Sequence, residues 1–267
     1  MKPSDKFDPR RYWEERLQNN YGLRGVGYLG LGENYNTWLY KIKRKVFTKT
    51  AKSLDLEYRS KDVLDIGSGT GFFVGLWKEL GVKSITGCDL TNIVIEELRK
   101  TYPKDNFVRL DIGESITNGS LGTYDIVSAF DVLYHILDDS RYKIAIKNIH
   151  HALRPDGLFL LSENFLHNQT ERGTHQVSRT LRDIELILQE IGFIVISRAP
   201  LFMLMNDPVD SGSNFRRLFW KATMLPVTKS EKLGFFMGAI LYFFESILVS
   251  RRKESPTTEI MVCKKIR

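Results

Sequence analysis

Short apolar runs alternate with amphipathic stretches through the middle of the chain, a pattern that favours a parallel sheet with crossover helices. Apolar runs typical of buried strands lie at residues 62–66, 84–88, 106–110, 124–130, 158–163 and 193–197. Between them, apolar positions three and four residues apart predict helices that end near residues 80, 101, 153 and 191. We therefore expect an α/β fold with a doubly wound, mostly parallel sheet.

The N-terminal part of the chain predicts a helical cap on this sheet. Residues 1–35 are rich in aromatic residues and glycine, and they predict a short helix followed by an irregular loop. Asn36 or Thr37 can cap a further helix that runs to about residue 54. One face of that helix is basic, and it is either solvated or meets a phosphate or lipid headgroup. Its cations are Lys41, Lys43, Arg44, Lys45, Lys49 and Lys52.

A long insert precedes the strand predicted at residues 258–264. Residues 204–257 are far more than a hairpin needs, and within them residues 233–249 carry one charge, Glu245. A membrane span here would separate the last strand from its sheet. We therefore expect a helical lid over the mouth at the sheet's carboxyl edge or a homodimer contact, and alternatively a helix on a membrane surface. The aromatic residues facing the mouth or a partner would be Phe235, Phe236, Tyr242, Phe243 and Phe244.

These patterns divide the chain into four parts. They are an N-terminal helical cap (1–58), an α/β core (59–203), a helical insert (204–257) and the last strand of the core sheet (258–267). The core and the last strand together predict a seven-stranded sheet.

Composition narrows the class of protein. With 42% hydrophobic and 12% aromatic residues, the chain can build a folded core, so disorder is excluded as its dominant state. Two cysteines cannot form a disulfide framework or a zinc knuckle, and they suit a reducing compartment. We expect a cytoplasmic protein with no secretory signal and no metal site. The alternative is a protein in peripheral contact with the inner membrane surface. The net charge of +7 favours an anionic partner.

The segment from Asp65 to Gly71 carries the clearest chemical signal. An apolar strand ends in glycines spaced G-x-G-x-G, whereas a dinucleotide loop has the spacing G-x-G-x-x-G. Glycines let the backbone adopt positive φ and approach a ligand closely. Asp65, Asp89 and Asp111 lie at the ends of the first three strands, where open α/β sheets bind ligands. A carboxylate at Asp89 can accept hydrogen bonds from both ribose hydroxyls.

In this order, these motifs resemble the class I S-adenosylmethionine-dependent methyltransferases. The glycine segment and its acids are similar to the family's cofactor motifs. Residues 124–135 resemble the fourth motif, and residues 153–160 resemble the turn into the fifth strand. The resemblance covers roughly residues 60–200 and the last strand. It implies the strand order 3-2-1-4-5-7-6 and a Rossmann-like methyltransferase fold.

The resemblance also implies how the cofactor, S-adenosylmethionine, would bind before it leaves as S-adenosylhomocysteine. Asp65 would lie near the amino group of the methionine part, and Asp89 would bind the ribose. Asp111 would accept from the exocyclic amine of adenine, and Phe130 would lie beside the reactive methyl. The remaining positions would pack against the methionine part (Gly67, Ser68, Gly69, Gly71) or flank the adenine (Leu90, Ile112).

Three residues near the ends of the fourth and fifth strands are candidate catalytic residues, namely His135, Glu163 and His167. Each could act as the general base for an acceptor, although methyl transfer can also rely on alignment alone. Asp131 is a further candidate beside them.

The expected acceptor is a small molecule, methylated at oxygen and of saccharide type. This choice rests on a resemblance of residues 24–28 and of the insert to bacterial methyltransferases directed at saccharides. A lipid-type acceptor at a membrane surface, an RNA substrate and a non-catalytic cofactor-binding module are the alternatives. No Asn/Asp-Pro-Pro-Tyr/Phe motif follows the fourth strand, which counts against methylation of nucleic-acid bases.

Overall fold

A seven-stranded sheet forms the centre of the computed structural model, which describes residues 7–117 and 119–266. The sheet order is β3-β2-β1-β4-β5-β9-β8, which confirms the predicted fold and strand order. Among these strands, β9 alone runs opposite to the others. The strands are β1 (Asp62–Ile66), β2 (Ser84–Asp89), β3 (Asn106–Arg109), β4 (Tyr124–Ala129), β5 (Leu153–Glu163), β8 (Phe193–Pro200) and β9 (Glu259–Lys265). Residues 1–6, 118 and 267 of the predicted parts lie outside the described residues.

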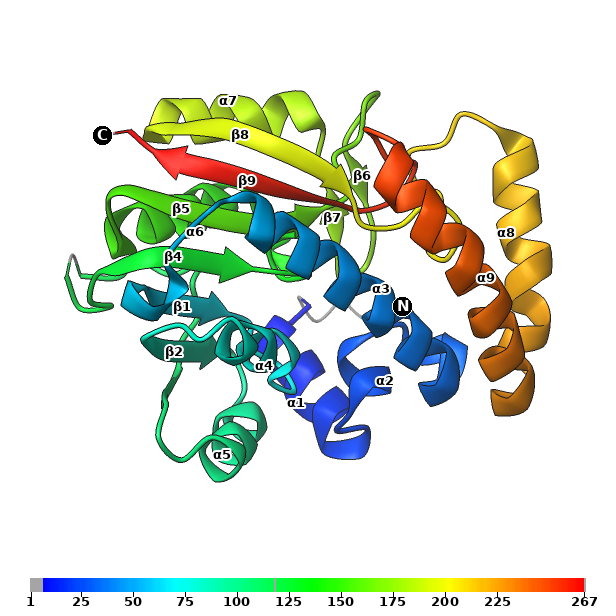
Figure 1. Cartoon of the computed structure of the whole chain (residues 1–267), viewed down its shortest axis with the longest axis horizontal. Coiled ribbons are helices and arrows are strands. Elements are labelled where there is room, and N and C mark those ends of the chain that lie inside the picture. Colours follow the sequence, from blue (N-terminus) through cyan, green and yellow to red (C-terminus); the bar gives the residue numbers. More distant parts are fainter. Residues whose placement is uncertain (1–6, 118, 267) are drawn as a thin grey trace, which may run out of the picture.

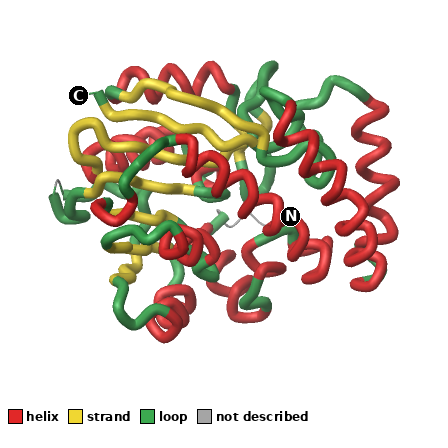
Figure 2. Tube along the Cα trace, in the orientation of Figure 1, coloured by secondary structure: helices red, strands yellow, loops and turns green. Residues whose placement is uncertain are grey.

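Helices cover both faces of the sheet, and the pleat of the strands divides the core between them (Figure 2). Along β1, Val63 packs in one hydrophobic cluster and Leu64 in the other, because successive side chains point to opposite faces. The first cluster includes side chains of α3 (Gly32–Ser53), α4 (Phe72–Glu79) and α5 (Asn92–Thr101). The second includes those of α6 (Asp139–Ala152) and α7 (Leu181–Ile191).

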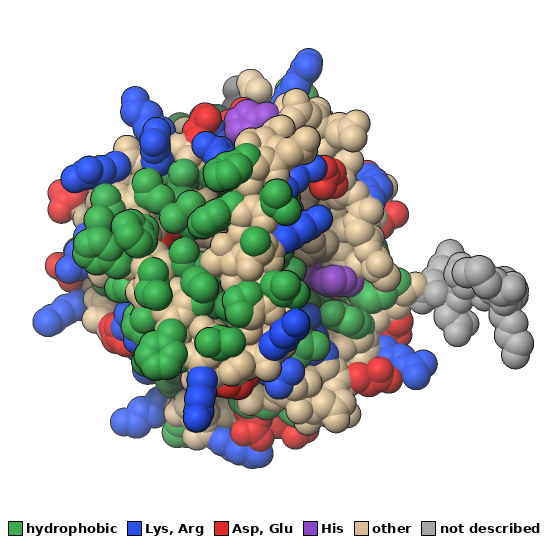
Figure 3. All heavy atoms as spheres, turned by 90° about the vertical axis from the view of Figure 1, so that its right-hand side faces the viewer, with side chains coloured by type: hydrophobic (Ala, Val, Ile, Leu, Met, Phe, Trp, Pro, Cys, Tyr) green, Lys and Arg blue, Asp and Glu red, His purple; other side chains and the backbone are tan. Residues whose placement is uncertain are grey.

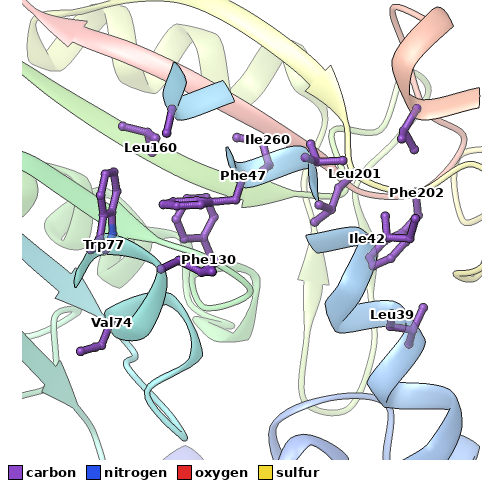
Figure 4. Packing of buried hydrophobic residues seen from close by; sticks show 14 of the residues in the cluster. Leu39, Ile42, Phe47, Val74, Trp77, Phe130, Leu160, Leu201, Phe202 and Ile260 are labelled. Atoms are coloured by element: carbon purple, nitrogen blue, oxygen red, sulfur yellow. The ribbon is translucent and has the colours of Figure 1, made fainter. Parts of the chain in front are cut away.

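Helix α3 crosses one face of the sheet (Figure 1), and many of its side chains belong to the first hydrophobic cluster. Phe47 of α3 points toward Phe130 at the end of β4, with Trp77 of α4 beside it (Figure 4). The helix begins at Gly32, so the predicted start at Asn36 or Thr37 is wrong. The amide of Asn36 instead donates to the carbonyls of Tyr28 and Gly32, which fixes the preceding loop against the helix.

The N-terminal segment folds against the carboxyl edge of the sheet. It comprises α1 (Pro9–Asn19), α2 (Leu23–Val26) and a short 3-10 helix at Leu29–Leu31. Asp8 caps α1, and Pro9 occupies its first turn, where a missing N–H costs nothing. The Glu14 carboxylate accepts from the backbone N–H groups of Asn92 and Ile93, so α1 caps the start of α5.

Short elements connect the larger ones. They are 3-10 helices at Tyr58–Ser60 and Leu133–His135, and a two-stranded ribbon of β6 (Glu171–Arg172) and β7 (Val177–Ser178). Helix α7 begins at Leu181 with Thr180 as its cap, because residues 177–178 pair in the ribbon.

The insert forms two helices, α8 (Asn214–Val227) and α9 (Glu231–Arg251), and α9 lies along α3 (Figure 1). A Cβ on Gly238 would lie 2.4 Å from the Trp38 ring, so the close approach of α9 to α3 requires glycine there. The buried Glu245 carboxylate accepts from the backbone N–H groups of Met203 and Leu204. The one charge in the apolar run therefore holds α9 to the segment after β8.

Candidate functional site

A cavity of about 560 Å³ opens at the carboxyl edge of the sheet. The loop after β1 and the ends of β2, β3 and β4 form one side of it. The opposite side comes from the N-terminal segment, through Phe7, Pro9, Trp13, Leu17 and Val26. Apolar and aromatic side chains make up much of the wall, as in small-molecule sites generally.

The glycine loop gives this cavity a wall made of backbone. Gly67 and Gly69 have φ values of +67° and +51°, a region that favours glycine. A Cβ on Gly67 would lie 2.2 Å from Val132 Cγ2, and one on Gly69 would lie 3.1 Å from Val26 Cγ1. The N–H groups of Gly67 and Ser68 both donate to the carbonyl of Cys88, which fixes the loop to the end of β2. Side chains at Gly67 and Gly69 would therefore occupy the space between the loop backbone and its neighbours, and we call this backbone wall the cradle.

Asp89 lies in the cavity wall at the end of β2, as predicted. Its Oδ2 accepts from the Gly69 N–H at 3.1 Å, and its Oδ1 accepts from the backbone and hydroxyl of Thr91. Burial raises the pKa of this carboxyl. A carboxylate oxygen accepts about two hydrogen bonds, so Thr91 uses both lone pairs of Oδ1 and Oδ2 retains one. Asp89 can therefore hold the glycine loop and still accept a hydroxyl from a ligand.

Leu90 and Ile112 line the cavity beside Asp89, together with the carboxylate of Asp111. Asp111 is already paired, because its Oδ2 lies 2.5 Å from Arg141 Nη2 and its Oδ1 accepts from the Gly113 N–H. Arg141 also lines the cavity, and sequence reasoning missed it. It lies in the first turn of α6, where nothing in the local pattern indicates that it reaches back to β3.

Two predicted cofactor residues, Asp65 and Gly71, flank the glycine loop. Neither is among the described residues that line the cavity. Asp65 is buried and accepts from the Ser128 hydroxyl at 2.6 Å, and burial raises its pKa to about 7. Gly71 has φ +81°, and a Cβ there would lie 2.7 Å from Leu98. Both residues support the loop from below. Phe130 does line the cavity, with its ring stacked on Phe73.

Asp131 forms a polar centre in the wall, directly after β4. Its φ of +60° is uncommon for a residue other than glycine, and such strain concentrates at functional sites. Lys43 Nζ lies 2.5 Å from Oδ2, and the Ser162 hydroxyl donates to Oδ1. Lys43 is buried, so this cation of the basic face of α3 pairs with Asp131 and meets neither solvent nor a headgroup.

His135 lines the cavity and has a defined tautomer. Its Nδ1 lies 2.8 Å from the carbonyl oxygen of His175, and a carbonyl only accepts. Nδ1 therefore carries the proton and Nε2 has the lone pair. The ring packs edge to face with Trp13 of α1. Burial lowers the pKa of His135 to about 4, so the imidazole is neutral near neutral pH.

The other two catalytic candidates are not among the described residues that line the cavity. His167 lies in the segment after β5, where its Nδ1 pairs with Asp210 Oδ2 at 2.5 Å, and this hydrogen bond raises its pKa. Glu163 is fully buried at the end of β5, with its Oε1 3.5 Å from the Tyr142 hydroxyl. Of the three candidates, the structure brings only His135 to the cavity.

Buried Glu163 predicts a pH dependence of stability. Burial raises its pKa to about 8 from a usual 4.5, so the folded protein holds a proton that the unfolded chain releases. The stability that this proton provides is present below pH 4.5 and is lost as pH rises through about 8. Glu163→Gln removes this titration. We expect the free energy of unfolding of the variant, measured with urea, to fall less between pH 4.5 and about 8 than that of the parent chain. Asp65 and Glu245, with pKa values raised to about 7, keep a residual slope in the variant.

The matched control for this experiment is Glu185→Gln on the exposed face of α7. Its profile should run parallel to that of the parent chain. Parallel profiles for Glu163→Gln as well would contradict the assignment of a buried, protonated Glu163.

The structure does not place the insert over the cavity, so the predicted lid is wrong. None of the described residues that line the cavity comes from 204–257, and α1 closes that side instead. Phe235 and Tyr242 pack against Trp38 of α3. Phe236, Phe243 and Phe244 are exposed. Sequence reasoning recognised the apolar helix, and its error was to place that helix over the cavity.

Comparison with known proteins gives a family match over the same region. A family profile described as a methyltransferase domain matches residues 38–198. A ribosomal protein L11 methyltransferase of Staphylococcus carnosus is 24% identical over 141 residues, which are 52% of this chain and 39% of that protein. The chain therefore spans well under half the length of that curated relative.

Solved structures share the fold at low identity. A SAM-dependent methyltransferase from Methanosarcina mazei superposes with a TM-score of 0.51 at 14% identity, covering 81% of this chain and 97% of that one. The [4+2]-cyclase SpnF superposes with a TM-score of 0.50 at 15% identity, covering 77% and 74%. One of these two is named as a cyclase, so the fold alone does not define the reaction.

Proposed function

The chain belongs to the methyltransferase-domain family, whose methyl donor is S-adenosylmethionine, and we propose that it methylates a small-molecule acceptor in the cavity between the glycine loop and His135. One observation carries the proposal. A backbone cradle that only glycine allows and a neutral histidine whose lone pair is on Nε2 line the same cavity.

The residues of the cavity fit the cofactor. Gly67 and Gly69 leave room for a ligand against the backbone, and Asp89 Oδ2 retains a lone pair for a ribose hydroxyl. Leu90 and Ile112 offer apolar surface to an adenine ring. When bound, the cofactor supplies a sulfonium methyl group, so the protein needs no nucleophile of its own.

The chain's own residues would prepare the acceptor. His135 Nε2 would take the proton of an acceptor hydroxyl, since Nδ1–H is held by the carbonyl of His175. Asp131 would orient the acceptor through an oxygen lone pair, while Lys43 and Ser162 hold the carboxylate in position. Trp13 would exclude water by closing the cavity over His135.

A hydroxyl acceptor of saccharide type suits these groups best. Asp131 and His135 both offer acceptor atoms for hydroxyl hydrogens, beside the aromatic rings of Trp13 and Tyr40. An RNA substrate has less support, because two cations of the basic face of α3 already have partners. Lys43 pairs with Asp131, and Arg44 pairs with Glu79.

A lipid-type acceptor is the second candidate, because the α8–α9 side of the protein exposes a large apolar surface. Incubation with methyl-labelled S-adenosylmethionine and separate pools of saccharides, lipids and RNA distinguishes the acceptors. We expect label in the saccharide pool. Label confined to lipid supports the second candidate, and label confined to RNA contradicts both. Binding of S-adenosylhomocysteine, measured by calorimetry, with no label in any pool would contradict an enzyme and favour a non-catalytic cofactor-binding module.

A further inference from the structure

Helices α8 and α9 expose two apolar stripes that no described part of the chain covers. On α9 the exposed positions follow helical spacing, with Phe236 at 64% and Phe243 at 63% exposure. On α8 the stripe begins at Phe215, which is 75% exposed. The side of the protein that carries these helices shows hydrophobic side chains gathered across one face (Figure 3). The face comprises Phe215, Leu218, Phe219, Leu225, Leu233, Phe236, Ile240, Phe243, Phe244 and Ile247, and we call it the α8–α9 face.

Within residues 214–253 the exposed charges are of one sign apart from Glu231. Of the acids just beyond that range, Glu254 pairs with Arg198, and Asp207 lies near Arg217 and Lys221. The acids of residues 214–253 are Glu231 and Glu245. Glu245 is fully buried, and Glu231 accepts from the backbone N–H groups of Glu33 and Asn34. The exposed cations are Arg216, Arg217, Lys221, Lys229, Lys232, Arg251, Arg252 and Lys253.

Helix α9 is the one helix among the described residues whose length and composition would let it cross a membrane, and 28% of its apolar window is buried. Its place in the fold excludes a span. It lies between β8 and β9, which are neighbours in one sheet, and Gly234 and Gly238 bring its other face against α3. A helix held in this way can meet a bilayer only from the side.

We propose that the α8–α9 face docks on the surface of an anionic lipid bilayer. The aromatic and aliphatic stripes would enter the boundary between headgroups and acyl chains, and the surrounding cations would bind the anionic headgroups. The charge pattern favours this occupant over a second copy of the chain. A symmetric dimer brings the same patch together from both subunits, so the basic residues around it would face their own copies.

The carboxyl ends of β1 and β4 point toward the side that carries α8 and α9 (Figure 1). Docking would therefore bring the edge of the sheet that holds the cavity toward the bilayer. The docking proposal does not depend on the nature of the acceptor, and it stands even if the protein proves to bind the cofactor without turnover.

Co-sedimentation of the full chain with vesicles tests the proposal. Vesicles of phosphatidylcholine with phosphatidylglycerol should bind the protein, with affinity at least about tenfold higher than vesicles of phosphatidylcholine alone. The double variant Phe236→Ser/Phe243→Ser should lose most of this binding. The matched control is Leu186→Ser, which removes an exposed leucine from α7 and should bind as the parent chain does. Circular dichroism and binding of S-adenosylhomocysteine verify that each variant is folded.

Salt separates the two parts of the interaction. Binding should weaken between 0.1 M and 0.5 M salt but persist in part, because screening removes only the electrostatic share. No vesicle binding by the folded parent chain would overturn the proposal. A dimer in light scattering that the phenylalanine variants dissociate, without vesicle binding, would overturn it in favour of a second copy. Unchanged vesicle binding by those variants would also overturn it.

Discussion

Gly67→Ala should weaken binding of S-adenosylhomocysteine by roughly 100-fold or more, which corresponds to about 2.7 kcal/mol. The new methyl group would lie 2.2 Å from Val132 Cγ2, and its backbone would keep an unfavourable φ of +67°. Relief of the contact requires the loop or Val132 to move, and both line the cavity. Isothermal titration calorimetry measures the affinity, and circular dichroism verifies the fold.

Gly119→Ala is the matched control, because it introduces a similar backbone strain to Gly67→Ala without a steric clash. Gly119 has φ +85°, but a Cβ there would meet no atom within 4 Å. This variant should lose about 1 kcal/mol of stability from its backbone conformation and keep the parent affinity. Parent-like affinity in Gly67→Ala would show that the glycine loop does not cradle the cofactor.

His135→Ala should lower kcat by about 10²–10⁴-fold, the range for loss of a general base. The affinity for S-adenosylhomocysteine should change little, since the proposed role of His135 concerns the acceptor. Because the pKa of His135 is lowered to about 4, its protonation should depress the rate of the parent enzyme only as pH falls toward that value. A steady-state pH profile checks this: inactivation centred near pH 6.5 would indicate a different base.

His167→Ala compares the two histidines that the sequence proposes. His167 pairs with Asp210 and lies outside the cavity lining, so its removal should leave kcat within about twofold of the parent value. A large loss of kcat in His167→Ala with a normal rate in His135→Ala would reverse the assignment.

The sheet could be predicted because its signals are local. Each strand is a short apolar run, and the loop from Gly67 to Gly71 marks where the first strand ends. Helix starts were less predictable. Asn36 has the chemistry of a cap, but contacts with Tyr28 and Gly32 use its side chain for the preceding loop. Such tertiary contacts override local preference.

The residues on the cofactor side of the cavity have local signals in the sequence, whereas those on the acceptor side are brought together by tertiary contacts. Asp89 is the last residue of its strand, whereas Lys43 reaches Asp131 across 88 positions of sequence. Glu163 ends the fifth strand and His167 follows it closely, but closeness in sequence does not fix where a side chain points. Glu163 is buried at the end of β5, and the chain beyond it carries His167 to Asp210.

The position of β9 has a consequence for how the chain folds during synthesis. β9 lies between β5 and β8, so the sheet stays in two pieces until residues 259–265 have left the ribosome. Until then, the edges of β5 and β8 lack their partner strand, and α8 and α9 have already emerged with their apolar surface. Nascent chains in this state present both an open strand edge and an apolar helix, the two features that recruit chaperones or promote aggregation. The sheet therefore cannot be completed before β9 has emerged from the ribosome.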